Sequence, residues 1–415
     1  MKILISAYSC EPGAGSERGL GWNVAREVAK YHQVWVLTRP DESRTAIEAE
    51  LEKNPVPNLH FVYFTLPFWQ DSLRWGQSGA MQIHYYLWQI QAYFVARRLH
   101  QEIDFDVAHH VTFVKYSSPS FLSLLPIPFV WGPVGGGESA PKPFWQDFSP
   151  KAKLYELARS FARNIGERDP FVAITANRSS IIRVTTKDTA ARIYRLGVKI
   201  EHLQISSESS LPKAEIARIS RYQAVDTSTV RFISMGRLLH WKGFYLGIRA
   251  FALANIPNAE YWIVGDGVEL QSLQDLASRL GVADKVKFWG RLPREETLSK
   301  LGQAQVLVHP SLHDSGGWVC LEAMAARKPV ICLDLGGPAV QVTDETGIRV
   351  AASNPKQATK DLAEAMQLLA TDNELRTSMG KAGYSLVSDR FSLEGMGEEI
   401  NHLYSEIVKD AKVTV

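Results

Sequence analysis

The sequence is poor in cysteine, in long apolar runs and in excess charge, and each shortage excludes a class of protein. Its three cysteines lie far apart and form no C-x-x-C pair, which argues against a disulfide framework or zinc ribbon and fits a reducing compartment. The longest apolar stretch, residues 85–96, contains two glutamines and is shorter than the roughly 18 residues of a membrane span. With 46 basic against 44 acidic residues, the net charge of +2 gives no field for bulk binding of nucleic acid.

The composition is that of an ordinary globular protein. Of its 415 residues 45% are hydrophobic and 22% charged, and this length suggests two domains. The opening MKILISAYSC is too short for the apolar part of a signal peptide and reads as a buried strand. We therefore expect a cytoplasmic protein with at most peripheral contact to the inner face of the membrane.

Short apolar runs alternate with helical segments, which is typical of doubly wound α/β sheets. The runs expected to form strands are residues 3–6, 34–37, 59–64, 107–110, 128–131, 230–234, 261–264, 286–289, 306–309 and 330–333. The segments with helical periodicity include residues 19–30, 243–255, 270–280, 321–327 and 356–370. Because the alternation occurs twice, we predict two Rossmann-like domains facing each other across a cleft.

The domain boundaries follow from where this alternation stops and restarts. Residues 1–205 form the expected first domain and residues 229–385 the second. Residues 206–228 are polar and rich in serine and read as a linker. Residues 386–415 contain an amphipathic helix that we expect to return to the first domain.

A glycine-rich loop, residues 11–19, follows the first strand and opens a helix. Gly13 and Gly15 would let the backbone approach a phosphate or a sugar, beside the N–H groups of the helix start. A tight turn without a ligand is the alternative. An NAD site is disfavoured, because the spacing is G-x-G-x-x-x-G and no acidic residue ends the second strand.

Two further loops follow predicted strands of the second domain. In residues 236–243, Arg237 and Lys242 could bind a diphosphate together, Arg237 through its planar guanidinium and Lys242 through its compact ammonium. The alternative is that both cations are simply solvated. In residues 309–325, a Gly-rich turn runs into a helix. Asp314 and Glu322, which have seven residues between them, could accept hydrogen bonds from sugar hydroxyls; the alternatives are a helix cap and a buried structural carboxylate. The backbone N–H groups that could bind an anion here belong to Gly316, Gly317, Trp318 and Val319.

These motifs, together with residues 264–267, 288–291 and 335–338, resemble the GT-B retaining glycosyltransferases of glycosyltransferase family 4. The resemblance covers most of the chain and is closer in its second half. It implies that Arg237 and Lys242 bind the donor pyrophosphate and that Glu322 binds the nucleotide ribose. It also implies that the backbone of Arg291 and Leu292 lies along the edge of the nucleotide base. The glycines expected to approach the donor are Gly13, Gly15, Gly265, Gly316 and Gly317, followed by Trp318 and Val319 at the helix start.

The sequence departs from the family pattern in two places. The family commonly has Glu where this chain has Asp314, which puts the preference for sugar hydroxyls in doubt. Many members also carry a histidine after the strand at residues 128–131. This chain has none there, so we expect His110, or else His109, to take a catalytic role, with a structural role as the alternative. A D-x-D at residues 104–106 precedes a strand and reads as a loop rather than a metal site.

Aromatic residues are concentrated in residues 68–93, with Trp75 among them. Together with Lys151, Lys153, Arg159 and Arg163 on the next predicted helix, they could form a surface for an acceptor lipid, or simply be core aromatics and solvated charges.

The sequence therefore predicts a retaining glycosyltransferase that moves a hexose, glucose from UDP-glucose by family frequency, to a saccharide or lipid-linked acceptor. The resemblance implies a metal-independent reaction without a further cofactor. The alternatives are a nucleotide-sugar epimerase or a phosphorylase on the same scaffold, and a non-catalytic protein that binds sugar nucleotides. The sequence does not specify the oligomeric state.

Overall fold

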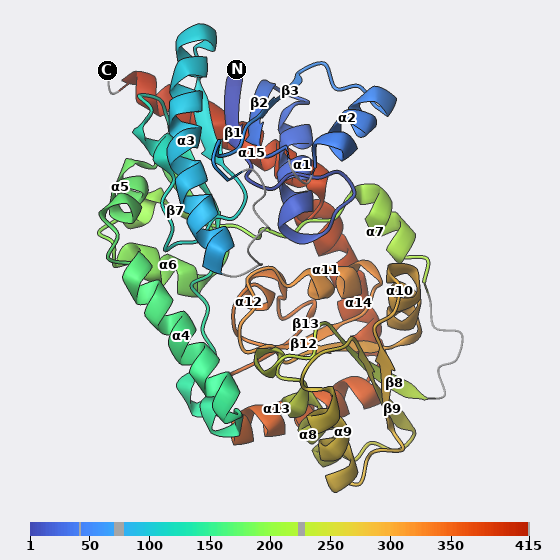
Figure 1. Cartoon of the computed structure of the whole chain (residues 1–415). Coiled ribbons are helices and arrows are strands. Elements are labelled where there is room, and N and C mark those ends of the chain that lie inside the picture. Colours follow the sequence, from blue (N-terminus) through green and yellow to red (C-terminus); the bar gives the residue numbers. More distant parts are fainter. Residues whose placement is uncertain (41–42, 70–78, 223–228, 414–415) are drawn as a thin grey trace. The chain divides into compact units, whose positions relative to one another are not determined.

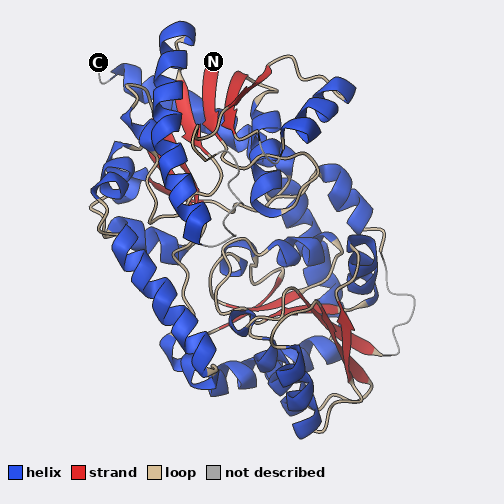
Figure 2. Cartoon of the chain, in the orientation of Figure 1, coloured by secondary structure: helices blue, strands red, loops and turns tan. Residues whose placement is uncertain are grey.

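The structure is a computed structural model that describes residues 1–40, 43–69, 79–222 and 229–413 (Figure 1). Internal contacts divide the chain into two units. Unit 1 consists of Met1–Gly137, Arg159–Glu208 and Leu393–Val415, and unit 2 of Glu138–Ala158 and Ser209–Ser392. Each unit has its own parallel sheet with helices packed on it (Figure 2). The predicted fold class of two Rossmann-like α/β domains is confirmed.

Unit 1 is built on a parallel sheet with the strand order β3-β2-β1-β4-β5-β6-β7. Its strands are β1 (Lys2–Ser6), β2 (Gln33–Thr38), β3 (Leu59–Tyr63), β4 (Val107–His110), β5 (Phe129–Val134), β6 (Ile181–Val184) and β7 (Leu203–Ile205). Its helices are α1 (Ser16–Val28), α2 (Arg44–Lys53), α3 (Gly79–Ile103), α5 (Pro170–Arg178), α6 (Lys187–Tyr194) and α15 (Leu393–Val413). Helix α4 (Pro150–Gly166) begins in the sequence of unit 2 and ends in that of unit 1.

The first strand shows why this sheet is apolar on both faces. Ile3 and Ile5 point into one core with Val24 of α1 and Ile400 of α15, whereas Leu4 points into the other core, on the side of α3. All three strand residues are fully buried. A strand covered by helices on both faces must be apolar at successive positions, which is the pattern that the sequence shows.

Unit 2 is built on a parallel sheet with the strand order β10-β9-β8-β11-β12-β13. Its strands are β8 (Val230–Met235), β9 (Ala259–Val264), β10 (Val286–Gly290), β11 (Val306–His309), β12 (Val330–Leu333) and β13 (Gly347–Val350). Its helices are α7 (Lys213–Ile219), α8 (Phe244–Ala254), α9 (Leu270–Arg279), α10 (Arg294–Gln303), α11 (Trp318–Ala325), α12 (Pro338–Gln341), α13 (Pro355–Thr371) and α14 (Asn373–Arg390).

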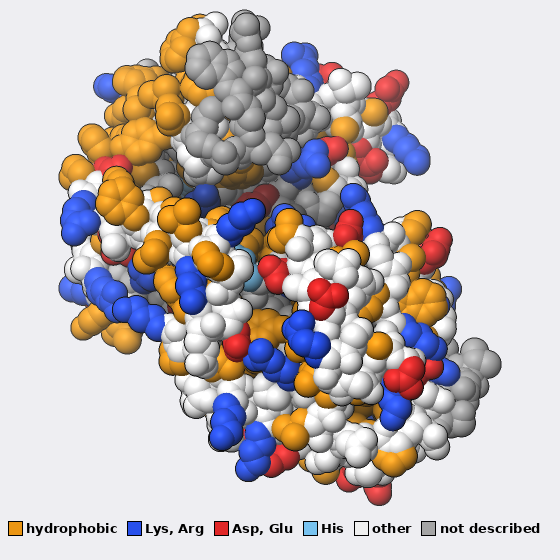
Figure 3. Space-filling view, turned by 60° about the horizontal axis from the view of Figure 1, so that its bottom comes forward, with side chains coloured by type: hydrophobic (Ala, Val, Ile, Leu, Met, Phe, Trp, Pro, Cys, Tyr) orange, Lys and Arg blue, Asp and Glu red, His pale blue; other side chains and the backbone are white. Residues whose placement is uncertain are grey.

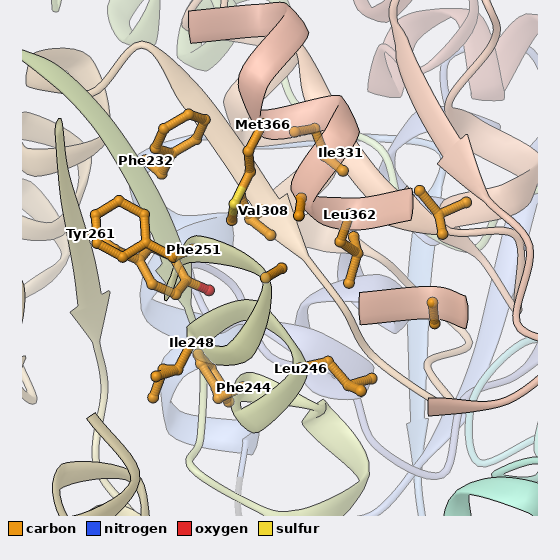
Figure 4. Packing of buried hydrophobic residues seen from close by; sticks show 14 of the residues in the cluster. Phe232, Phe244, Leu246, Ile248, Phe251, Tyr261, Val308, Ile331, Leu362 and Met366 are labelled. Carbon is orange, nitrogen blue, oxygen red and sulfur yellow. The ribbon is translucent and has the colours of Figure 1, made fainter. Parts of the chain in front are cut away.

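The main core of unit 2 lies between its sheet and helices α8 and α13 (Figure 4). Phe232 and Tyr261 come from adjacent strands and pack with Phe251 of α8, while Ile331 lies near Met366 of α13. These side chains are nearly or fully buried, so the sheet is a rigid base for the loops at its ends.

Every strand expected from the sequence is present, and the described residues form three further strands that were not predicted. The missed strands, β6, β7 and β13, have only three or four residues each. In β6 the apolar run is interrupted by Arg183, whose buried side chain lies 3.0 Å from the carboxylate of Glu399 on α15. Because this ion pair places a charged residue inside the short strand β6, apolar periodicity alone does not predict that strand.

Three boundaries differ from those expected. Much of the expected linker at residues 206–228 is folded into unit 2: α7 buries Ile216 and Ile219, and the N–H of Leu211 donates to the carbonyl of Phe391. The return to unit 1 begins at Leu393, where α15 starts and packs against α1. Residues 138–158 lie within the expected first domain but belong to unit 2.

Within the described chain, none of the helices has both the length and the apolar character needed to cross a membrane. Of the aromatic residues in the stretch 68–93, Tyr85 and Trp88 of α3 are buried in a core of unit 1, whereas Phe68 is 75% exposed. Trp75, expected at a lipid surface, lies outside the described residues.

In each sheet the strand order changes direction at one point, between β1 and β4 in unit 1 and between β8 and β11 in unit 2. Open α/β sheets bind ligands beyond the carboxyl ends of the strands at such points. The loops that follow β1, β8 and β11 are the three motif loops of the sequence. The topology therefore places each motif where this fold holds its ligands.

Candidate functional site

The two motif loops of unit 2 are packed against each other. Gly243 has a φ of +65°, and a Cβ atom there would lie 2.0 Å from the carbonyl oxygen of Pro310. The N–H of Leu312 donates to the carbonyl of Trp241 over 2.7 Å. This close approach requires glycine at position 243 and fixes the loop after β8 on the loop after β11.

The centre of this site is a three-residue charge cluster. The ammonium of Lys242 lies 2.5 Å from Oδ2 of Asp314, and Nε2 of His309 lies 3.1 Å from the same oxygen. Burial alone would raise the pKa of Asp314, but the hydrogen bond from His309 and the charge of Lys242 outweigh it and hold that pKa well below its usual value. Burial lowers the pKa of His309. The arrangement is therefore a carboxylate held by an ammonium and a neutral imidazole.

Asp314 also binds the start of the glycine turn. Its Oδ1 accepts from the N–H groups of Gly316 and Gly317, over 3.3 and 3.2 Å. Gly317, with a φ of +59°, is the N-cap of α11, and Trp318 and Val319 form the half-buried first turn of that helix. The side chain of Asp314 thus already occupies two of the N–H groups expected to receive an anion.

Glu322 lies on α11 and is 7% exposed. Burial raises its pKa, which the nearby guanidinium of Arg294 opposes. Nη1 of Arg294 lies 2.7 Å from Glu322, and its Nη2 lies 3.0 Å from Glu215 of α7. Arg294 was not predicted from the sequence, because its partners are far from it along the chain.

The remaining predicted residues of unit 2 surround these loops. Arg237 is exposed in the loop after β8. Gly265 follows β9 with a φ of +140°, and its N–H donates to the carbonyl of Gly290 at the end of β10. Arg291 is exposed and Leu292 half-buried in the next loop. Their expected roles toward a nucleotide or sugar stay predictions.

A buried cluster contributed by residues 138–158 supports both loops. The carboxylate of Glu156 accepts from Nε2 of His240, at 3.1 Å, and from Nε2 of His313, at 3.4 Å. The indole of Trp241 is stacked between the rings of Tyr155 and His313, with centroid distances of 5.2 Å on both sides. This set fastens the loop after β8 to the loop after β11.

Glu138 makes a similar contact from the other end of the same segment. It is 2% exposed and accepts a hydrogen bond from the hydroxyl of Ser315 over 2.7 Å. His240 and His313 of the buried cluster lie within the two motif loops of unit 2. Nothing in the sequence, however, predicts that carboxylates from residues 138–158 contact these histidines.

In unit 1 the glycine-rich loop follows β1, and Gly15 is the N-cap of α1. A Cβ atom on Gly13 or Gly15 would meet no atom of the described residues within 4 Å. Beside the loop, Glu17 accepts from the N–H of Phe113 over 3.0 Å. Burial raises the pKa of Glu17 despite this bond and the charge of Lys115.

The structure places both candidate histidines inside unit 1. His110 is fully buried, with its Nε2 within 3.3 Å of Tyr85, Gln89 and the carbonyl of Thr112, and burial lowers its pKa to about 4. His109 bridges Tyr404 of α15 and the carbonyl of Gly132. Neither ring is exposed, so the catalytic role expected for His110, or for His109, has no support from its position and stays a prediction.

The D-x-D motif lies at the amino end of β4. Asp106 accepts from the N–H of Lys2 over 2.7 Å, and Asp104, which directly follows α3, has a φ of +61°. Both residues are therefore at the edge of the sheet opposite to the carboxyl ends of the strands.

Comparison with solved structures identifies the fold. The UDP complex of HepE from Anabaena superposes with a TM-score of 0.63 at 17% identity, covering 98% of this chain and 100% of that chain. The lipopolysaccharide outer core galactosyltransferase WaaB gives the same TM-score at 11% identity, covering 98% of this chain and 100% of that one. The chain has the GT-B fold.

Sequence comparison agrees with the expected resemblance. Residues 216–386 match the family model described as glycosyl transferases group 1. Among curated proteins, the lipopolysaccharide core biosynthesis glycosyltransferase LpsE of Rhizobium meliloti (strain 1021) is 32% identical over 213 residues, which are 51% of this chain and 60% of that protein. LpsD of the same strain is 29% identical over 58% of this chain and 66% of that protein. The matches thus span less than two thirds of these relatives.

Proposed function

We propose that the protein is a retaining glycosyltransferase that moves glucose from UDP-glucose to a saccharide or lipid-linked acceptor in polysaccharide or glycoconjugate biosynthesis. The observation that carries this proposal is the Lys242–Asp314 pair, which stands beside the glycine turn that opens α11. Together with Arg237 and Glu322, it offers cations for a diphosphate and a carboxylate for a ribose at the carboxyl ends of β8 and β11.

In the proposed reaction, the ammonium of Lys242 and the guanidinium of Arg237 stabilise the charge that develops on the leaving diphosphate. The N–H groups at the start of α11 add to this stabilisation. Glu322, oriented by Arg294, accepts hydrogen bonds from the ribose hydroxyls. The acceptor attacks from the face that the diphosphate leaves, and a phosphate oxygen of the leaving group takes the proton. No metal or further cofactor takes part in this scheme.

Support for the donor and the acceptor comes from similar proteins. HepE has been solved in complex with UDP-glucose. The two Rhizobium relatives act in biosynthesis of the lipopolysaccharide core. A relative from Corynebacterium glutamicum is instead described as dependent on GDP-mannose, so GDP and GDP-mannose belong in any test. We also propose a cytoplasmic location, because all three cysteines are free and buried.

A thermal-shift panel tests this function without knowledge of the acceptor. Each of UDP, GDP, ADP, UDP-glucose, UDP-galactose and GDP-mannose is added without metal. A ligand at a hundred times its Kd stabilises by about 2.7 kcal/mol, which raises Tm by several degrees. We expect the largest shift with UDP-glucose and a much smaller one in Lys242→Ala. A shift with GDP alone contradicts the donor, and no shift with any nucleotide in folded protein contradicts the function.

A further inference from the structure

Helix α4 carries a stripe of large apolar side chains that are exposed in the described part of the chain. Leu154, Leu157, Phe161 and Ile165 are 68%, 57%, 67% and 57% exposed. Their spacing of three, four and four residues places them on one face of the helix. The opposite face is packed: it contains Ala152 and Glu156, which are buried.

The charged residues of α4 are distributed unevenly around this stripe. Lys151 and Lys153 are exposed near its beginning, whereas Arg163 is buried. Just beyond its end Arg168 is exposed, and the neighbouring Glu167 is paired with Arg192. The one acidic residue of the helix, Glu156, points inward to its two histidines. The outer face of α4 is therefore apolar and basic without a carboxylate. On the face of the molecule drawn in Figure 3, hydrophobic side chains also lie exposed beside Lys and Arg side chains.

We propose that this outer face of α4 binds the surface of an anionic lipid bilayer. The helix would lie in the plane of the interface, with its four apolar side chains among the upper acyl groups and its lysines extended to the lipid phosphates. A second copy of the chain is a poorer partner, because two such faces would bring cations together without a carboxylate to pair them. The inference goes beyond the proposed transfer reaction and does not depend on it.

Vesicle flotation of the full chain tests this surface. Purified protein is mixed with vesicles of phosphatidylcholine alone, or of phosphatidylcholine and phosphatidylglycerol at roughly two to one. We expect flotation with the anionic vesicles only, and less of it at high salt, since screening weakens the contribution of the lysines. The double variant Phe161→Gln, Ile165→Gln should bind more weakly by about tenfold for each side chain removed.

The matched control replaces two apolar side chains that are equally exposed elsewhere. Leu253 and Leu368 are 57% and 47% exposed on α8 and α13. The double variant Leu253→Gln, Leu368→Gln should float like the wild type. Circular dichroism establishes that both double variants are folded, as expected for changes at exposed positions.

Three outcomes would overturn the inference. One is wild-type protein that stays with the unbound fraction at low salt. Another is equal flotation of the wild type and the Phe161→Gln, Ile165→Gln variant. The third is a dimer, seen by light scattering, that the same variant dissociates without any flotation, which would make the stripe a contact between copies. The thermal-shift panel with nucleotides is a separate experiment. A failure of the proposed lipid-binding surface can therefore be distinguished from a failure of the proposed transferase function.

Discussion

The buried carboxylate of Glu156 offers a direct test of how the two loops of unit 2 are held together. In the change Glu156→Ala, the imidazoles of His240 and His313 lose the acceptor that they share at 3.1 and 3.4 Å. Both rings are nearly buried, with side-chain exposures of 11% and 9%, so water cannot fully replace the lost oxygen. The stacked Trp241 would also lose the support of a fixed His313.

The magnitude follows from these contacts. A buried donor left without an acceptor costs about 1–3 kcal/mol, and two imidazoles lose their acceptor here. We take about 3 kcal/mol for Glu156→Ala. With a urea m-value of about 3 kcal/mol/M for a unit of this size, the unfolding midpoint should fall by about 1 M. Glu156→Gln keeps a carbonyl acceptor for one ring, so its midpoint should fall by about 0.3 M.

Urea unfolding followed by circular dichroism and tryptophan fluorescence measures this shift, and only the transition of unit 2 should move. Glu364→Ala is the control, because Glu364 is 60% exposed and pairs with Lys360 over 3.4 Å on the surface of α13. Such a pair contributes less than about 1 kcal/mol. UDP affinity of Glu156→Ala should fall by at least tenfold, while that of Glu364→Ala is unchanged. A Glu156→Ala protein with the midpoint and UDP affinity of the wild type would refute the reasoning.

Three further predictions address the charge cluster, the buried histidines and the metal. Lys242→Ala should lower turnover by roughly 10²–10³, the scale of losing one donor to a developing anion, whereas unchanged turnover would remove Lys242 from the mechanism. Burial lowers the pKa values of His109 and His110 to about 3 and about 4, so both rings stay neutral in the fold while the unfolded chain takes up protons near pH 6.5. Their stabilisation is complete above about pH 7 and is lost as the pH falls toward those values, by about 3 kcal/mol in total between pH 7.5 and 5.5. His110→Gln should therefore show a smaller acid-induced fall of its urea midpoint than the wild type, and an equal fall contradicts the assignment. Finally, turnover should survive a chelator, and a loss that manganese restores would contradict the proposed metal-free reaction.

The sequence predicts the sheets well because their signal is local. A strand such as β11 is apolar at nearly every position, since helices cover both of its faces. The loops after β8 and β11 stand out in the sequence by their glycine and charged residues, although the reason for glycine at position 243, the backbone oxygen of Pro310 at 2.0 Å from its missing Cβ, lies in a distant segment. Features fixed by a few adjacent residues can be found without coordinates.

The parts of the site that the sequence did not predict are held by contacts between distant segments. Glu156 meets His240 across 84 residues, and Glu138 meets Ser315 across 177. Arg294 reaches Glu322 from a different helix. In each case an isolated charged or polar residue in the sequence has many roles open to it, and only the packing of the chain selects one. His110 is the converse: its position at the end of a strand suggested chemistry, and its burial is visible only in the fold.

Asp314 has a consequence for how a donor could bind. Its carboxylate already receives the ammonium of Lys242, the N–H of His309 and the N–H groups of Gly316 and Gly317. These include the groups that the proposed function assigns to the diphosphate. A diphosphate that takes Lys242 must therefore weaken a buried ion pair, and part of its interaction energy is lost to that exchange. The same pair holds the loops in place before any ligand arrives, which reduces the ordering that binding requires. The proposed site therefore binds the ground-state substrate more weakly than a site with an unpaired ammonium would. Its ammonium, however, is already positioned before the reaction begins. This arrangement favours a transition state in which the leaving group carries more negative charge than it does in the substrate.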